Sequence, residues 1–317
     1  MRQIQQSEVE DFTDKDLQDV YGKVEDLDVV DIDAFRDEFL DHLVTDAAQS
    51  GIQLPWAETS DLVRLRMGEV SVWAGINGHM KSTVLNQCLT WAASKVPVGL
   101  ASFEMSVKDT AKLMCMQSAA SDQPSRDYGE RFANWSKDKI FWYRILGGVQ
   151  PIQCLGAIVA MARRGCKIVA IDNLQFTGVT EDIQRERLFF NQLMGLAEAL
   201  DIHIAVVHHV RKPERGGDEY VPTRFDVRGG GTITDQCHLL MIVWHNKKRK
   251  EALNKQMYGI PLNDKEQEVL EKQSDLKLVV AKQRHGTGFE GTIGLFQTSG
   301  RAFKKRENSR ALVLEEI

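Results

Sequence analysis

Short apolar runs and amphipathic stretches with a helical period alternate along most of the chain. The apolar runs predict buried strands, and the stretches with apolar residues at i, i+3 and i+4 predict helices. The predicted strands lie at 70–74, 98–103, 140–145, 167–171, 202–207, 238–244, 276–281 and 290–296, and the predicted helices at 82–94, 106–120, 151–164, 185–200 and 231–236. This alternation favours an α/β fold with a mainly parallel central sheet flanked by helices on both faces.

The end of the pattern differs from its beginning. The last predicted strands follow one another with no helical segment of comparable length, which predicts an antiparallel edge of the sheet. Residues 246–274 are charged and lack strand character, so they indicate an excursion between two strands. We find no internal repeat and no low-complexity tract.

Residues 1–50 form a separate part of the pattern. They are rich in Asp and Glu and contain no proline, and Phe35, Phe39 and Leu43 give a helical apolar stripe. Gly51 and Pro55 then break the pattern. The sequence therefore predicts an acidic helical segment at 1–50 and one larger domain at 51–317.

Composition excludes several classes of protein. With 43% hydrophobic and 27% charged residues, the 317-residue chain has the makeup of a globular protein with a real core. No apolar run approaches the roughly 20 residues that span a bilayer, and the first residues lack an apolar signal region, so no membrane association and a cytoplasmic location are expected. The 5 cysteines are scattered without a C-x-x-C pair, which favours reduced thiols.

The net charge of −5 argues against a surface broadly covered by nucleic acid. Basic clusters at 247–250 and 304–306 are compatible with a nucleic-acid channel confined to one part of the surface. Each cluster is also compatible with a solvated loop or tail.

The candidate chemistry begins at residues 75–83, GINGHMKST, which follow a predicted strand and precede a predicted helix. The stretch matches the phosphate-binding loop G-x-x-x-x-G-K-[ST] at every fixed position except the second glycine, which is Met80. The candidate nucleotide-binding residues are Gly75, Asn77, Gly78, His79, Met80, Lys81, Ser82 and Thr83.

The residue types suit a nucleoside triphosphate. A helix N-terminus attracts phosphate, and Gly75 and Gly78 can adopt positive φ angles so that the backbone curls around it. Lys81 would reach the β- and γ-phosphates, and the Ser82 hydroxyl would ligate Mg²⁺. The Met80 side chain either crowds the phosphates or points away from them. A chance cluster of Gly, Lys and Ser in a turn is the simpler alternative.

Two acidic residues follow predicted strands. Asp172 ends the strand at 167–171, where phosphate-loop ATPases place an aspartate that holds Mg²⁺. Glu104 follows the strand at 98–103, where a carboxylate can orient and activate the attacking water. A common Asp-Asn turn and a glutamate favoured by a helix dipole are the respective structural alternatives.

The phosphate loop, Phe103-Glu104-Met105-Ser106 and Ile171-Asp172-Asn173 together resemble the DnaB-like replicative ring helicases, which have a RecA-type core. The resemblance is closest to the helicase part of bacteriophage primase-helicases and covers roughly residues 60–297. Three further segments resemble the family's later motifs, at 207–213, 226–233 and 279–286.

The resemblance implies roles for these later motifs. His209 would sense the γ-phosphate, with His208 as the competing candidate in the doublet. The residues implied to contact DNA are Arg228, Gly229 and Gly230. Arg284, assisted by Lys282, would reach into the ATP site of the neighbouring subunit, although a Lys-Gln-Arg run also suits a solvated strand end.

As a whole, the resemblance implies a DNA helicase that hydrolyses ATP with Mg²⁺ and moves 5′ to 3′ along single-stranded DNA. It implies a homo-oligomeric ring, a hexamer with ATP sites between subunits, and replisome proteins as partners in the cytoplasm of a phage-infected bacterium. Residues 1–50 would then be a linker that docks on the adjacent subunit.

Two alternatives remain open at this level. Because Met80 departs from the family glycine, the chain could bind nucleotide without hydrolysing it and serve as an assembly or scaffold protein. A RecA-type strand-exchange ATPase shares the same core, but the Glu-Met-Ser segment at 104–106 favours the helicase.

Overall fold

The computed structural model describes residues 31–44, 50–211, 217–229 and 231–306. The chain divides into two compact units, Met1–Asp46 and Ala47–Ile317. In the first unit, the described residues form η2 (Ile32–Phe35) and α2 (Arg36–Val44), on which Phe35, Phe39 and Leu43 are exposed. The rest of the predicted acidic segment lies outside the described residues, and its boundary at residue 50 and its docking role stay predictions.

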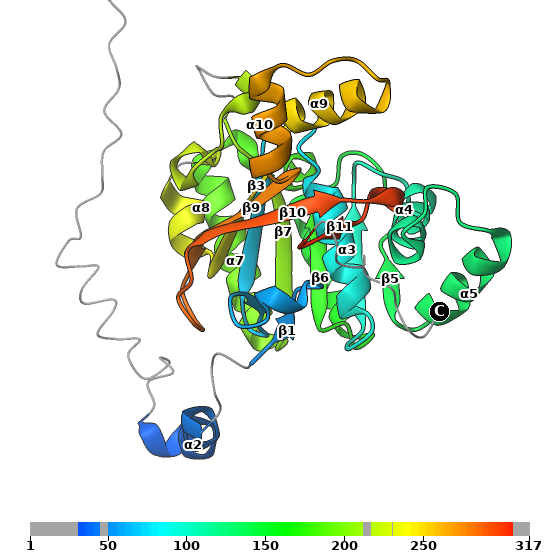
Figure 1. The fold of residues 1–317 in the computed structure, drawn as a ribbon. Coiled ribbons are helices and arrows are strands. Elements are labelled where there is room, and N and C mark those ends of the chain that lie inside the picture. The colour runs from blue at the N-terminus through cyan, green and yellow to red at the C-terminus, as the bar shows by residue number, and fades with distance from the viewer. Residues whose placement is uncertain (1–30, 45–49, 212–216, 230, 307–317) are drawn as a thin grey trace, which may run out of the picture. The chain divides into compact units, whose positions relative to one another are not determined.

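The second unit is built on one large mixed sheet (Figure 1). Its strand order is β11-β10-β9-β8-β3-β7-β6-β4-β5, and the neighbours from β8 to β5 all pair in parallel. From β8 to β11 the pairing is antiparallel. The strands are β3 (Val70–Gly75), β4 (Val98–Ser102), β5 (Ile140–Trp142), β6 (Ile168–Asp172), β7 (His203–His209), β8 (Leu239–His245), β9 (Leu276–Gln283), β10 (Gly291–Gln297) and β11 (Phe303–Lys304).

Helices cover both faces of this sheet. The helices of the first face are α3 (Lys81–Ala92), α4 (Val107–Ala119) and α5 (Arg126–Ser136), and their buried side chains share a core with Trp73 of β3. The helices of the second face are α6 (Pro151–Ala162), α7 (Ile183–Ala199) and α8 (Gly231–Gln236), which pack around a second core with Val72. The predicted α/β class with a parallel centre and an antiparallel edge is confirmed.

The smaller elements complete the second unit. β1 (Ile52–Gln53) and β2 (Arg64–Leu65) form a separate antiparallel pair. Short 3-10 turns connect the main elements: η3 (Ala57–Thr59), η4 (Leu174–Thr177), η5 (Val179–Glu181), η6 (Gly217–Glu219), η7 (Arg224–Asp226) and η8 (Ser299–Arg301). Within the described residues, no helix is long and apolar enough to cross a membrane.

The observed elements include several that the sequence pattern did not predict, namely α5, α9, α10 and the short strands β1, β2 and β11. β5 is three residues long rather than the predicted six, and the sequence analysis missed α5. Tyr128, Phe132 and Trp135 of α5 have helical spacing and pack against the first core, so a usable signal was present.

The excursion at 246–274 is a helical hairpin made of α9 (Lys247–Met257) and α10 (Asp264–Lys272). The absence of an intervening helix therefore holds for the antiparallel pair β9 and β10 but not for β8 and β9. Antiparallel neighbours need only a tight turn. Here α9 and α10 return the chain to the same edge of the sheet instead.

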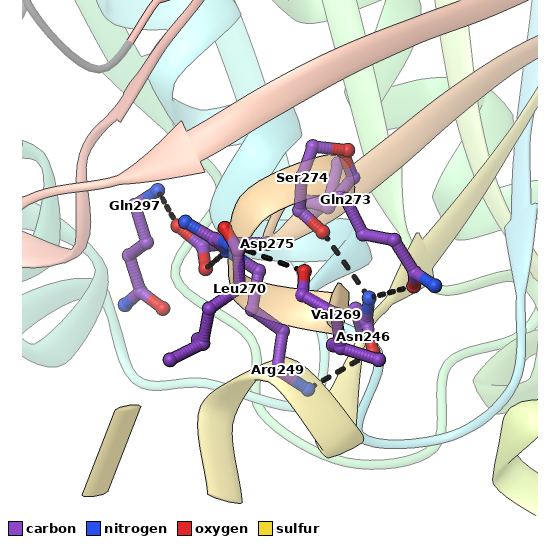
Figure 2. Close-up of polar contacts among 9 residues, drawn as sticks. Asn246, Arg249, Val269, Leu270, Gln273, Ser274, Asp275 and Gln297 are labelled. Atoms are coloured by element: carbon purple, nitrogen blue, oxygen red, sulfur yellow. Dashed lines mark hydrogen bonds and ion pairs between the residues drawn. The ribbon is translucent and has the colours of Figure 1, made fainter. Parts of the chain in front are cut away.

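A buried ion pair holds the base of this hairpin (Figure 2). Arg249, which is 3% exposed, donates from Nε to Asp275 Oδ1 at 2.8 Å and also donates to the carbonyl of Leu270 in α10. The second oxygen of Asp275 accepts from the backbone N–H of Gln297 at 2.8 Å. The basic cluster at 247–250 is therefore not a uniform basic surface, because its arginine fixes α9 to α10 and to the sheet.

We expect Asp275→Ala to lower the free energy of unfolding by about 3–5 kcal/mol, because it leaves the Arg249 guanidinium buried without its carboxylate. Chemical denaturation monitored by circular dichroism measures this loss. Glu268→Ala, which removes an exposed pair with Lys272, is the control and should change the value by less than about 1 kcal/mol. Equal effects of the two substitutions would contradict a structural role for the buried pair.

Candidate nucleotide-binding site

The loop between β3 and α3 has the shape of a phosphate-binding loop. Gly78 has a φ of 77°, which only glycine adopts readily. Gly75 is needed for a different reason than the sequence suggested, since its φ is not positive. A Cβ built on Gly75 would lie 2.5 Å from the carbonyl oxygen of Val243 in β8, so this position requires close backbone packing.

Met80 takes the left-handed conformation, with φ 65° and ψ 25°, directly before α3. This conformation costs a residue with a Cβ about 1–2 kcal/mol and is ordinarily left to glycine. The side chain is partly buried and packs against the core of the α3 face, while it also borders the cavity described next. The loop thus keeps its turn without the second glycine.

Most of the predicted site residues meet at one cavity of about 300 Å³ at the carboxyl edge of the parallel strands. It is lined by Asn77, Gly78, Met80, Lys81, Ser82, Thr83, Glu104, Met105, Asp172, Asn173, Val207, His209 and Arg301. His79 is not among them. Its side chain is fully buried, and its Nδ1 accepts from the backbone N–H of His245, so it supports the loop from behind.

Lys81 lines this cavity and is 6% exposed. Its ammonium donates to the carbonyl of Ile76 at 3.1 Å and to His209 Nδ1 at 3.4 Å. Burial lowers the pKa of Lys81 to about 8, although the carboxylates of Asp172 and Glu104 act in the opposite direction. A buried cation of this kind suits an anionic ligand such as phosphate.

Asp172 ends β6 and is 3% exposed. Burial raises its pKa to about 6, against the effect of a hydrogen bond with Ser82. Its Oδ1 atom is buried and has no hydrogen-bond partner among the described residues. An aspartate oxygen without a partner beside a serine hydroxyl fits Mg²⁺, which prefers oxygen ligands and usually takes the others from water and phosphate.

Glu104 follows β4 and lines the same cavity. It is exposed, and its Oε2 accepts from Asn173 Nδ2 at 3.0 Å. Asn173 adjoins Asp172, so the amide fixes the two carboxylates relative to one another. A second cavity of about 470 Å³ continues past Glu104 and His209 to Arg228.

The two histidines at the end of β7 have different surroundings. His209 pairs in register with Gly75 and lines both cavities, whereas His208 is 1% exposed and faces the carbonyl of Arg228. Burial, with help from Lys81, lowers the pKa of His209 to about 4, so the ring is neutral at pH 7. Because an ammonium only donates, Nδ1 accepts and Nε2 carries the proton that a phosphate oxygen could receive.

Lys282 and Arg284 lie at the other end of the sheet. Gln283 pairs with Leu239, the first residue of β8, and β8 runs parallel to β3. Arg284 is thus separated from its own phosphate loop by about 20 Å, the length of the six-residue strand β3.

Both cations contact the last turn of α8, where a helix dipole favours positive charge. Lys282 Nζ donates to the carbonyls of Thr234 and Asp235 at 2.7 and 2.8 Å, and Arg284 donates to the Asp235 carbonyl at 2.8 Å.

The candidate DNA-contacting turn is described in part. Arg228 is exposed and lines the second cavity, and Gly229 has a φ of 85°. Gly230 lies outside the described residues.

Sequence reasoning missed several cavity residues, above all Arg301. It comes from η8, and its carbonyl accepts from the Gln117 side chain, which also donates to the carbonyl of Thr83. No local pattern links position 301 to the phosphate loop. Asn173, by contrast, directly follows the predicted Asp172 and could have been included.

These features define a RecA-like phosphate-loop domain. Over 205 residues the chain is 25% identical to the DNA helicase/primase of Enterobacteria phage T3, a match that covers 58% of this chain and 36% of that protein. The chain thus matches only about a third of the length of this curated relative. No family model matches the chain.

Two solved structures share the fold. One of them, described as an ATPase domain, has a TM-score of 0.68 at 18% identity and covers 88% of this chain and 100% of its own. A DnaB-like replicative helicase, described with its interactions with primase, has a TM-score of 0.64 at 16% identity and covers 92% of this chain and 72% of its own. The predicted resemblance to DnaB-like helicases is confirmed.

Replacing Met80 by glycine should change Mg-ATP affinity by less than about threefold, because the loop already has the required turn and the side chain packs against the core. Isothermal titration calorimetry measures this affinity. Lys81→Ala is the contrasting variant and should weaken binding strongly. Tightening of tenfold or more in Met80→Gly would show that the methionine occupies space that the phosphates need.

The affinity for Mg-ATP should be highest between about pH 6 and pH 8. Below this window Asp172 is protonated and loses its charge for Mg²⁺, and above it Lys81 loses its proton. Titration at a series of pH values checks this profile. Asp172→Asn should weaken binding and abolish the acid limb, and Lys81→Arg should shift the alkaline limb upward, since arginine stays protonated. Unchanged limbs in these variants would refute the assignment.

Proposed function

We propose that this chain is the motor domain of a replicative DNA helicase that hydrolyses ATP and moves 5′ to 3′ along single-stranded DNA as a homo-oligomeric ring. One observation carries the proposal. The phosphate loop and Arg284 lie at opposite ends of one sheet, so each chain offers two complementary halves of an ATP site. Head-to-tail contacts between copies would join these halves, and such contacts form a ring when the rotation between neighbouring copies closes on itself.

The first half holds the nucleotide. Lys81 would neutralise the β- and γ-phosphates, and Ser82 and Asp172 would ligate Mg²⁺, which supplies further neutralisation of the phosphate charge. Glu104, oriented by the Asn173 amide, would accept the proton of the attacking water. His209 would donate from Nε2 to the γ-phosphate.

The second half would come from the neighbouring copy. Arg284 is exposed and offers a fork of donors that matches phosphate oxygens. Its present contact with the Asp235 carbonyl leaves other N–H groups available, because a guanidinium carries five. Lys282 would assist from the same edge.

Single-stranded DNA would follow the turn at Arg228 and Gly229. This turn lies beside His209 at the second cavity, so a nucleic acid there would be close to the γ-phosphate. Phosphate contacts of this kind are strongly salt-dependent. The net charge of −5 favours a confined path over a broad basic surface.

The assembly and partners follow from the relatives. One relative is named a DNA helicase/primase, and one structural neighbour is described with primase, so we propose a hexameric ring that works with replisome proteins in the cytoplasm of a phage-infected bacterium. Met80 adopts the left-handed backbone conformation that a glycine would have at this position, so the loop retains its turn. This supports ATP hydrolysis over a role as a non-hydrolysing scaffold protein.

Mixing inactive variants tests the shared site. Lys81→Ala and Arg284→Ala chains should each lack ATPase activity stimulated by single-stranded DNA. Mixed in equal amounts, they should recover about a quarter of the wild-type rate, since about one interface in four then pairs an intact Lys81 with an intact Arg284. The readout is phosphate release with and without oligothymidylate.

The matched control mixes Lys81→Ala with Glu104→Gln. Both residues belong to the same half of the site, so no interface of that mixture is complete and no recovery is expected. Equal recovery in the two mixtures, or full activity of monomeric Arg284→Ala chains, would refute the shared site.

A further inference from the structure

Glu186 is a buried carboxyl group that the proposed chemistry does not use. It lies on α7 and is 2% exposed. Its Oε1 atom is 3.6 Å from His208 Nε2, beyond hydrogen-bond distance, and has no hydrogen-bond partner among the described residues. Such a group is costly to bury, so its position needs an explanation.

The other carboxyl oxygen of Glu186 packs under the turn that precedes α8. A Cβ built on Gly229 would lie 2.0 Å from Glu186 Oε2 and 2.8 Å from Cδ1 of Ile233. With a φ of 85°, Gly229 is therefore required twice, for its conformation and for the space that Glu186 fills. The carboxyl group and the turn fit each other closely.

His208 connects the same place to the nucleotide cavity. Its Nε2 donates to the Arg228 carbonyl at 3.2 Å, and its Nδ1 is a second buried atom without a partner in the described structure. The next residue along β7 is His209, which lines the cavity. Glu186 thus lies against both the proposed DNA turn and the strand end that carries His209.

We propose that Glu186 is a positioning residue that sets the Arg228–Gly229 turn against the end of β7, so that the DNA turn and His209 move together. The proposal rests on the proposed function for the roles of Arg228 and His209. A backbone hydrogen bond from the Arg228 N–H to the His209 carbonyl at 3.1 Å joins the turn to the strand end, and the two buried polar atoms without partners lower the stability of this junction.

The protonation states of Glu186 and His208 affect the contact between the turn and the end of β7. Burial raises the pKa of Glu186 to about 7 and lowers the pKa of His208 to about 4, so the histidine is neutral and forms no ion pair with the glutamate. The charged groups that act on His208 are Arg228 from the turn and Lys81 from the cavity, whereas burial is the cause of the shift at Glu186 and α8 contributes apolar Ile233. The buried position favours the neutral form of Glu186. The stability that this form contributes to the junction is lost as the pH rises through about 7 and the carboxyl group ionises.

The experiment compares wild type, Glu186→Gln and Glu186→Ala. Binding of fluorescent oligothymidylate, with a non-hydrolysable ATP analogue, is measured from pH 6 to pH 8.5. Wild-type affinity should fall by about threefold to tenfold more than that of Glu186→Gln over this range, because only the wild type ionises there. Glu198→Gln, on the exposed side of α7, should behave as wild type.

Steady-state ATPase provides a second readout. Glu186→Ala should lose most of the stimulation by DNA while basal turnover stays within about twofold, and Glu186→Gln should retain the stimulation, because it keeps the shape of the neutral carboxyl group.

A double-mutant cycle tests the contact itself. Gly229→Ala should weaken DNA binding less in the Glu186→Ala background, where the clash with the carboxyl group is gone and only the positive φ and the contact with Ile233 still oppose the new Cβ. The proposal is overturned if Glu186→Gln keeps the wild-type pH profile, or if Gly229→Ala has the same effect in both backgrounds. Failure of the proposed function would instead appear in the wild type itself, as an absence of DNA binding and of stimulation.

Discussion

The parallel pairing of β3 with its neighbours is the constraint on which the rest of this structure depends. Parallel strands end at one edge of a sheet, so β3, β4, β6 and β7 bring their following residues to the same place. The register that sets Gly75 beside His209 also puts Lys81 within reach of the imidazole. The buried strands gain their stability from the two apolar cores, and the polar groups of the site depend on that rigid frame.

The antiparallel edge places the cations Lys282 and Arg284 at the end of the sheet opposite the phosphate loop. Because β9 runs against β8, its last residues lie where the parallel strands begin, far from the phosphate loop. A cation at that end cannot act on the nucleotide of its own chain. In the proposed function, Arg284 would act on the nucleotide of a neighbouring copy, so a complete ATP site would form only between two copies.

Desolvation is the common cause of the unusual charges around the cavity. It lowers the pKa values of Lys81 and His209 and raises that of Asp172. Several titratable groups with shifted pKa values in one cleft are typical of functional sites. Burying these groups does not stabilise the free protein, but it strengthens their interactions with a charged ligand. The left-handed Met80 and the unpaired oxygen of Glu186 belong to the same pattern, in which local stability is given up near the site.

The sequence alone determined the order of the main strands and of the helices α3, α4, α6, α7 and α8, the phosphate loop and the position of the two acids after their strands, because apolar periodicity and short motifs are local properties. Tertiary structure decided what depends on register and long-range packing: which histidine faces the cavity, why Gly75 must be a glycine, and that Arg301 reaches the loop. The direction of a side chain at a strand end depends on its neighbours across the sheet. Glu186 is the clearest case, because nothing near position 186 in the sequence indicates Gly229 or His208.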